Sequence, residues 1–140
     1  MSETQFKNQL KDKVNSNSPI YPIARSLYRS YCNLAGPFHT LPNFILFGVS
    51  RSGTTSLYQY LSQHPNIEPC AVKETRFFDM YYERGINWYR MNYPSKWQKF
   101  VFTKLKNKKF LTGEASGAYI ENPHAPKRIH DFDPNIKLIL

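Results

Sequence analysis

Residues 48–56, with the sequence Gly-Val-Ser-Arg-Ser-Gly-Thr-Thr-Ser, combine glycines, hydroxyl groups and one cation in a short segment. The segment follows a short apolar run, and the residues after it have the spacing of an amphipathic helix. Amides at the start of a helix point toward a common position, where the helix dipole adds partial positive charge. The pattern predicts a site for a phosphate-type anion, formed by Gly48, Arg51, Ser52, Gly53, Thr54, Thr55 and Ser56.

The spacing of Gly48 and Gly53 matches the start of a nucleotide-hydrolysing P-loop, but Thr54-Thr55 follows where such a loop has Lys-Ser or Lys-Thr. An NTPase needs that lysine to reach the β- and γ-phosphates. Here the cation lies inside the loop, at Arg51. The loop therefore favours binding of a nucleotide cofactor over hydrolysis of ATP or GTP. A P-loop kinase or NTPase-like nucleotide binder with a degenerate loop is the alternative.

The elements that would position this loop alternate between strands and helices. Apolar runs predict strands at 44–47, 110–114 and 136–140, and helical spacing predicts helices at 54–63, 85–93 and 123–132. Residues 96–109 carry six lysines, which we place on a solvated helix face. The alternation predicts an α/β fold, a P-loop-like three-layer αβα domain with a mainly parallel sheet over residues 41–140. We expect this domain to be incomplete at its C-terminus, because a strand begins as the chain stops.

Residues 1–40 are predicted to form an N-terminal extension. Residues 1–18 are polar and loop-like, and residues 22–34 form a basic amphipathic helix that Gly36-Pro37 ends. Its apolar face consists of Ile23, Leu27, Tyr31 and Leu34. We expect this face to pack onto the domain, and weak contact with a membrane surface is the alternative.

The composition narrows the partners of the chain. Its 19 lysines and arginines against 10 acidic residues give a net charge of +9, which favours anionic ligands. The chain has no recognised RNA- or DNA-binding motif, which argues against nucleic acid. Two distant cysteines argue against a disulfide scaffold or a zinc site, and no metal-ligand cluster is evident. No signal peptide or transmembrane run is seen, so we predict a soluble, cytoplasmic protein.

Four segments, in order, resemble the sulfotransferases that use 3′-phosphoadenosine 5′-phosphosulfate (PAPS), and most closely their carbohydrate (heparan-sulfate-type) branch. Residues 48–65 resemble the loop that holds the 5′-phosphosulfate. Lys-Glu-Thr-Arg-Phe-Phe-Asp at 73–79 resembles the segment with the catalytic glutamate, and Gly-Ile-Asn-Trp-Tyr at 85–89 follows it as in that branch. Residues 113–119 resemble a Glu-Lys-Ser/Thr-Pro-x-Tyr motif. The resemblance implies PAPS as the sulfuryl donor, a hydroxyl or amine acceptor on a small molecule or glycan, and no metal.

The resemblance also implies roles for single residues. Glu74 would be the general base that takes the proton of the acceptor, and Arg51 would stabilise charge on the cofactor. Ser116 and Tyr119 would either line the site or pack in the core. Arg51 stands where many members have lysine, and Ala115 replaces the lysine of the Glu-Lys-Ser/Thr-Pro motif. We expect the segment that grips the 3′-phosphate of PAPS to follow residue 140.

Overall fold

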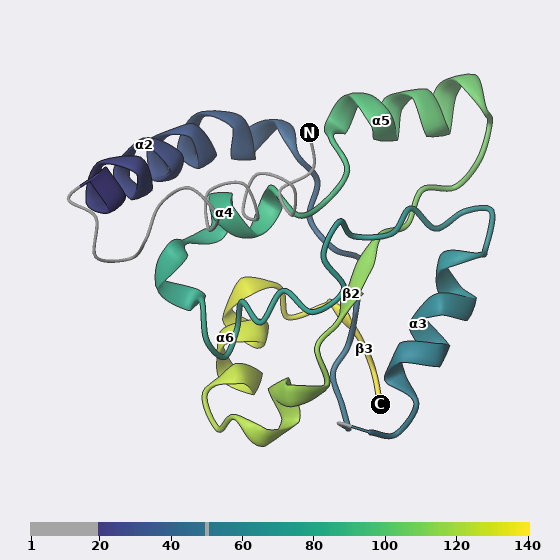
Figure 1. Cartoon of the computed structure of the whole chain (residues 1–140). Coiled ribbons are helices and arrows are strands. Elements are labelled where there is room, and N and C mark those ends of the chain that lie inside the picture. The colour runs from purple at the N-terminus through teal and green to yellow at the C-terminus, as the bar shows by residue number, and fades with distance from the viewer. Residues whose placement is uncertain (1–19, 50) are drawn as a thin grey trace.

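The computed structural model describes residues 20–49 and 51–140, so the predicted loop-like segment 1–18 and Ser50 lie outside the described residues. Helices and strands alternate along the chain (Figure 1). In order, the elements are α2 (Ile20–Ala35), a 3₁₀ turn (Gly36–Phe38), β1 (Phe44–Leu46), α3 (Thr54–Ser62), a 3₁₀ turn (Tyr82–Arg84), α4 (Ile86–Arg90), α5 (Lys96–Phe100), a π-helical turn (Val101–Leu105), β2 (Gly113–Ala115), a 3₁₀ turn (Gly117–Glu121), α6 (Ala125–Phe132) and β3 (Lys137–Ile139).

The three strands form one parallel sheet in the order β2-β1-β3. The central strand β1 aligns Phe44 with Gly113 on one side and with Lys137 on the other. All three residues of β1 are buried, as the continuous apolar run predicts for a strand covered on both faces. The predicted parallel α/β sheet is therefore confirmed.

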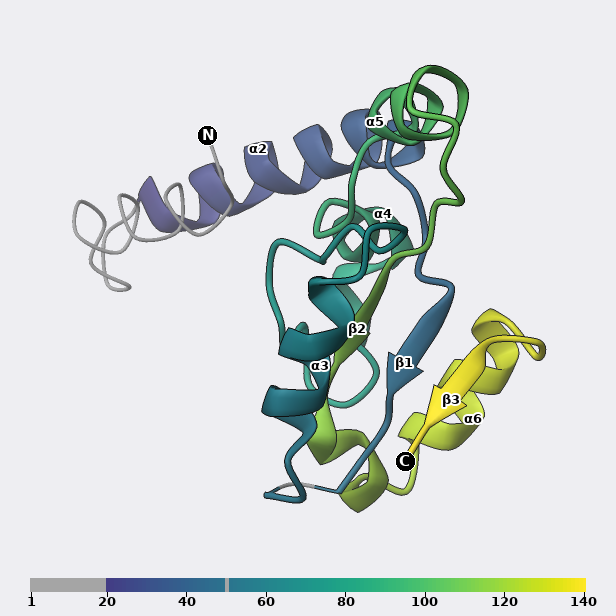
Figure 2. The same ribbon diagram turned by 90° about the vertical axis from the view of Figure 1, so that its right-hand side faces the viewer.

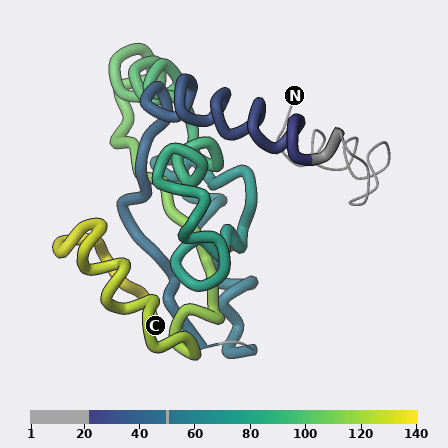
Figure 3. The backbone as a smooth tube through the Cα atoms, turned by 90° about the vertical axis from the view of Figure 1, so that its left-hand side faces the viewer, coloured from purple at the N-terminus to yellow at the C-terminus, as the bar shows by residue number. Residues whose placement is uncertain are grey.

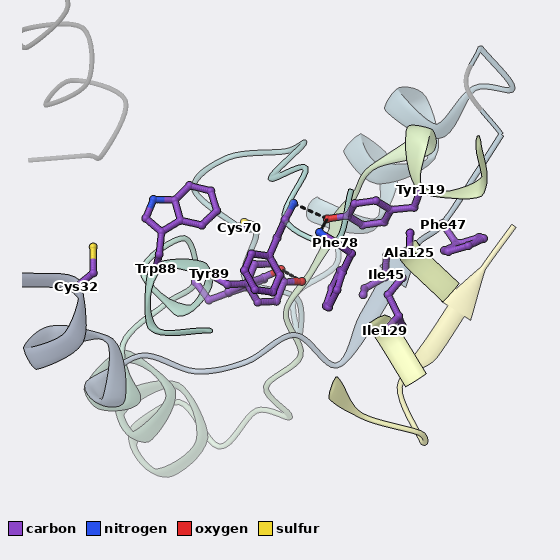
Figure 4. Packing of buried hydrophobic residues seen from close by; sticks show 12 residues of the cluster. Cys32, Ile45, Phe47, Cys70, Phe78, Trp88, Tyr89, Tyr119, Ala125 and Ile129 are labelled. Atoms are coloured by element: carbon purple, nitrogen blue, oxygen red, sulfur yellow. Dashed lines mark hydrogen bonds between the residues drawn. The ribbon is translucent and has the colours of Figure 1, made fainter. Parts of the chain in front are cut away.

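Helices cover both faces of this sheet, with α3 on one side and α6 on the other (Figure 2). Alternate residues of β1 and its continuation point into two separate clusters of buried side chains. Ile45 and Phe47 join the larger cluster, which holds Ile129 of α6 and the aromatic residues around α4 (Figure 4). Phe44 and Leu46 join the smaller cluster with Tyr58 of α3. This arrangement confirms the predicted three-layer αβα architecture.

A close backbone approach explains the glycine at the start of β2. A Cβ atom on Gly113 would lie 2.5 Å from the carbonyl oxygen of Phe44 and 2.6 Å from its ring. The two strands could not keep their spacing with any other residue at this position. Gly113 thus lets β2 carry the next residue, Glu114, directly against the centre of the sheet.

The structure corrects the packing expected for two helices. In α2 the predicted inward face is solvent-exposed, including Leu27 and Leu34, and the buried residue is Cys32. In α3 helical spacing predicts one apolar face with Leu57, Tyr60 and Leu61, but of these three only Leu61 packs against the core, and Tyr58 is the buried residue. The hydroxyl of Tyr58 donates to the carbonyl of Gly113 at 3.0 Å and accepts from the amide of Cys70 at 2.9 Å. These buried hydrogen bonds, which apolar periodicity does not reveal, determine the orientation of α3.

Candidate functional site

The predicted phosphate loop lies at the carboxyl end of β1, where open α/β sheets usually bind their ligands. Arg51 and Gly53 both have left-handed backbone conformations, with φ values of 67° and 87°. The amide and hydroxyl of Ser52 both donate to the carbonyl of Val49, at 3.1 Å and 2.6 Å. The amide and the hydroxyl of Ser52 therefore both close this turn, although Ser52 itself is exposed.

The first turn of α3 leaves backbone amides open to a ligand. Gly53 occupies the N-cap position and supplies no capping side chain. No atom of the described residues lies within 4 Å of the position that a Cβ on Gly53 would take. The first amides of a helix have no partner within the helix. The amides of Thr54, Thr55 and Ser56 are therefore open to a ligand, and their binding of an anion stays a prediction.

A second cation, Lys73, contacts the first turn of α3. This cation was not identified from the sequence. The ammonium group of Lys73 donates to the hydroxyl of Thr55 at 2.5 Å and lies 3.3 Å from the carboxylate of Glu74. The amide of Ala115 donates to the carbonyl of Lys73 at 3.1 Å and fixes the segment beside the end of β2. The sequence alone does not reveal this role of Lys73, because its contact with Thr55 spans 18 residues.

Glu74 thereby lies at the same end of the sheet as the loop. Half of its side chain is exposed, so an incoming substrate can reach the carboxylate. The structure brings Glu74 to the first turn of α3 through Lys73, but no side chain of the described residues pairs with the guanidinium of Arg51. The roles of Glu74 and Arg51 in chemistry remain predictions.

Glu114 anchors the segment that carries Glu74. Its side chain is fully buried and accepts from the Thr75 amide at 3.1 Å, from the Thr75 hydroxyl at 2.5 Å and from the Tyr89 hydroxyl at 2.6 Å. The hydroxyls of Ser116 and Tyr119 complete its coordination at 2.9 Å and 3.0 Å. Burial raises the pKa of the Glu114 carboxyl, although these donors oppose the shift. Ser116 and Tyr119 are therefore buried supports of Glu114.

The residues after Glu74 are fixed as well. The hydroxyl of Tyr119 accepts from the amide of Phe77 at 3.0 Å, and Figure 4 draws this bond as a dashed line to the Tyr119 oxygen. The guanidinium of Arg76 binds the carboxylate of Asp79 through its Nε at 2.6 Å, which raises the pKa of Arg76. Residues 73–79 therefore form a rigid turn against the core. His64 follows the end of α3, and its ring accepts from the amide of Asn66 at 3.1 Å.

Comparison with known proteins identifies the family. Residues 42–132 match the family described as "Sulfotransferase family". The chain belongs to the sulfotransferase family. This sulfotransferase is 42% identical to membrane-associated sulfotransferase kil1 of Dictyostelium discoideum, over 75% of this chain and 21% of that protein. It is 33% identical to heparan sulfate glucosamine 3-O-sulfotransferase 6 of Homo sapiens, over 71% of this chain and 26% of that protein. The predicted resemblance to the carbohydrate branch is thus confirmed.

A solved sulfotransferase from Alicyclobacillus acidocaldarius is 30% identical, with a TM-score of 0.48, and the match covers 71% of this chain and 43% of that one. This sulfotransferase chain spans about a fifth of the length of kil1 and about a quarter of the human enzyme. Among residues 20–49 and 51–140, no group of histidine, cysteine, aspartate and glutamate could hold a metal ion. No helix of that same part is long and apolar enough to cross a membrane. The cytoplasmic location stays a prediction.

Proposed function

We propose that the protein transfers a sulfuryl group from PAPS to a hydroxyl or amine of a carbohydrate. The observation that carries this proposal is the position of Lys73, whose ammonium group contacts both Thr55 in the open first turn of α3 and the exposed carboxylate of Glu74. An anion site and a candidate base thus share one end of the sheet. The relatives named as heparan sulfate sulfotransferases support a carbohydrate acceptor.

The described residues fit the 5′ end of the cofactor. The uncapped amides at the start of α3, the ammonium group of Lys73 and the exposed guanidinium of Arg51 would hold its 5′-phosphosulfate. When bound, PAPS supplies an activated sulfuryl group and leaves as adenosine 3′,5′-bisphosphate.

In this mechanism Glu74 accepts the proton that the acceptor hydroxyl or amine loses. Arg51 stabilises the negative charge that develops on the side of the 5′-phosphate, and it does so without giving up a proton, because a guanidinium stays charged. Lys73 holds the carboxylate of Glu74 next to the anion site. In this proposal Arg51 acts on the leaving side of the sulfuryl group and Glu74 on the acceptor side, while Lys73 stays paired with Glu74.

Replacing Arg51 with alanine is expected to weaken binding of adenosine 3′,5′-bisphosphate by about 10- to 100-fold, the worth of one charge-assisted hydrogen bond. Isothermal titration calorimetry of the protein would measure this loss. Arg51→Lys, which keeps the charge, should retain most of the affinity, and Arg25→Ala on α2 should change nothing. Tight magnesium-dependent binding of ATP, without affinity for the bisphosphate, would instead support the kinase alternative.

Replacing Lys73 with methionine is expected to weaken binding of the same bisphosphate by about 10-fold, because the ammonium group next to Thr55 is lost. Lys73→Arg should restore the affinity, since the charge returns on a side chain of similar length. The same calorimetry applies, with Lys109→Met as the control for loss of one exposed positive charge. Equal affinities of Lys73→Met and the unchanged protein would remove Lys73 from the anion site.

A further inference from the structure

Helix α2 carries a row of apolar side chains that the rest of the described chain does not cover. Ile23, Leu27, Tyr31 and Leu34 repeat at intervals of three and four residues, and Phe38 continues the row in the following turn. Their exposed fractions run from 56% for Tyr31 to 76% for Leu34. Single exposed apolar residues are ordinary, but five in one row form a contiguous surface.

This row is distinct from the side of α2 that packs on the protein. Cys32 is buried, and Tyr28 packs against the main core cluster. A helix turns by about 100° per residue, so Arg25 and Arg29 lie on the side of Cys32 away from the apolar row. The helix therefore has an apolar, open side and an opposite side that carries the buried Cys32 and the two arginines.

Helix α5 places a second apolar group beside the end of α2. His39 pairs with Ser95 in an isolated β-bridge, and the amide of Thr40 donates to the carbonyl of Pro94 at 2.9 Å. Phe38 thus lies one residue before this junction, and Trp97 lies two residues after it. The ring of Trp97 is 69% exposed and stacks on Phe100 with 5.5 Å between ring centroids. We call these two exposed apolar groups, which this junction brings to the same end of the molecule, the α2–α5 face.

The charge around the α2–α5 face has one sign. Neither residues 20–35 nor residues 96–109 contain an aspartate or a glutamate. The cations of these two segments are Arg25, Arg29, Lys96, Lys99, Lys104, Lys106, Lys108 and Lys109, all exposed. A second copy of the chain would meet this face with the same positive charge, which opposes self-association. A partner that is apolar inside and anionic at its surface satisfies both features.

The face also lies away from the candidate site. The chain passes from α2 into the amino end of β1, whereas the phosphate loop follows the carboxyl end of the same strand. Figures 1 and 3 show α2 and α5 together at one end of the molecule, and the loop between β1 and α3 at the other. A surface bound to the α2–α5 face would leave the loop open to solution.

We propose that the α2–α5 face docks on an anionic phospholipid surface. The apolar row of α2 and the Trp97–Phe100 pair enter the boundary between headgroups and acyl chains, and the exposed lysines of residues 96–109 contact the headgroups. Tyrosine and tryptophan suit this boundary, because their rings are apolar and carry a polar group at one edge. The proposal concerns a different surface from the sulfuryl-transfer site and does not depend on it.

Co-sedimentation with vesicles tests the proposal on the whole chain. Vesicles of phosphatidylcholine with about one-third phosphatidylserine should bind the protein, and vesicles of phosphatidylcholine alone should bind it much less. The double variant Leu27→Ser/Leu34→Ser should lower the binding constant by about 10-fold or more, because its apolar contacts are lost. Tyr60→Ser, which removes an equally exposed apolar residue from α3, is the matched control and should bind as the unchanged protein does.

Tryptophan fluorescence gives a second readout. Of the two tryptophans, Trp88 is 4% exposed and Trp97 is 69% exposed, so a blue shift on adding anionic vesicles reports Trp97. Trp97→Phe should abolish the shift and keep the binding. Absence of binding, binding of Leu27→Ser/Leu34→Ser equal to that of the unchanged protein, or sedimentation caused by self-association would each overturn the proposal. Binding to a soluble anionic glycan without a blue shift on vesicles would overturn it too.

Discussion

Replacing Glu74 with glutamine is expected to lower the turnover number for sulfuryl transfer by about 100- to 10,000-fold, the usual contribution of a general base. Glutamine keeps the size of the side chain but cannot take the proton of the acceptor. Binding of adenosine 3′,5′-bisphosphate should be retained, because Lys73 still contacts Thr55 when its carboxylate neighbour is gone. Transfer of radiolabelled sulfate from PAPS to a heparan-type acceptor measures the turnover, and calorimetry measures the binding.

Glu83→Gln is the control for Glu74→Gln, since it also neutralises an exposed glutamate but lies in the turn before α4. Unchanged turnover of Glu74→Gln with retained cofactor binding would remove Glu74 from the role of base. Loss of bisphosphate binding in the same variant would have a different meaning: Glu74 would then serve to position Lys73 at the anion site.

Replacing Glu114 with alanine is expected to lower the free energy of unfolding by about 3 to 5 kcal/mol, because several buried donors lose their acceptor at once. The Thr75 amide and the hydroxyls of Tyr89 and Ser116 would stay buried without this partner. Chemical denaturation followed by circular dichroism would measure the loss. Glu121→Ala, at an exposed position, should change the same free energy by less than about 0.5 kcal/mol. A similar effect of both variants would contradict the role of Glu114 as the anchor.

Glu114 also makes the free energy of unfolding depend on pH. Burial raises the pKa of Glu114 above the ordinary value of 4.5, so the folded chain holds this proton more tightly than the unfolded chain does. Stability therefore falls as the pH rises from 4.5 through the raised value, and levels off above it. Glu114→Gln, which cannot ionise, should remove this part of the slope. A slope that is the same in both proteins would assign the dependence to other groups.

The sequence predicted the elements whose signals are local. A continuous apolar run identified β1, and glycines with hydroxyls before a helical spacing identified the loop. The roles of Lys73 and Glu114 could not be predicted from the sequence. Lys73 contacts Thr55, 18 residues away, and Glu114 contacts Thr75, 39 residues away. Periodicity located the apolar row of α2 correctly but could not tell which side of the helix the core would take. Tertiary packing decides which side of the helix is buried, and in the structure this is the side with Cys32 and Tyr28.

The hydrogen bonds between Glu114 and the neighbours of Glu74 bear on how an acceptor is chosen. A turn fixed from both sides by buried bonds does not close over its substrate, and little ordering entropy is left to lose when the acceptor arrives. In the proposed mechanism the backbone of Glu74 then stands at its working position before any acceptor is present. Under that proposal, selection among acceptors would rest on which hydroxyl or amine can reach the carboxylate, so that the geometry of the acceptor would decide which atom is sulfated.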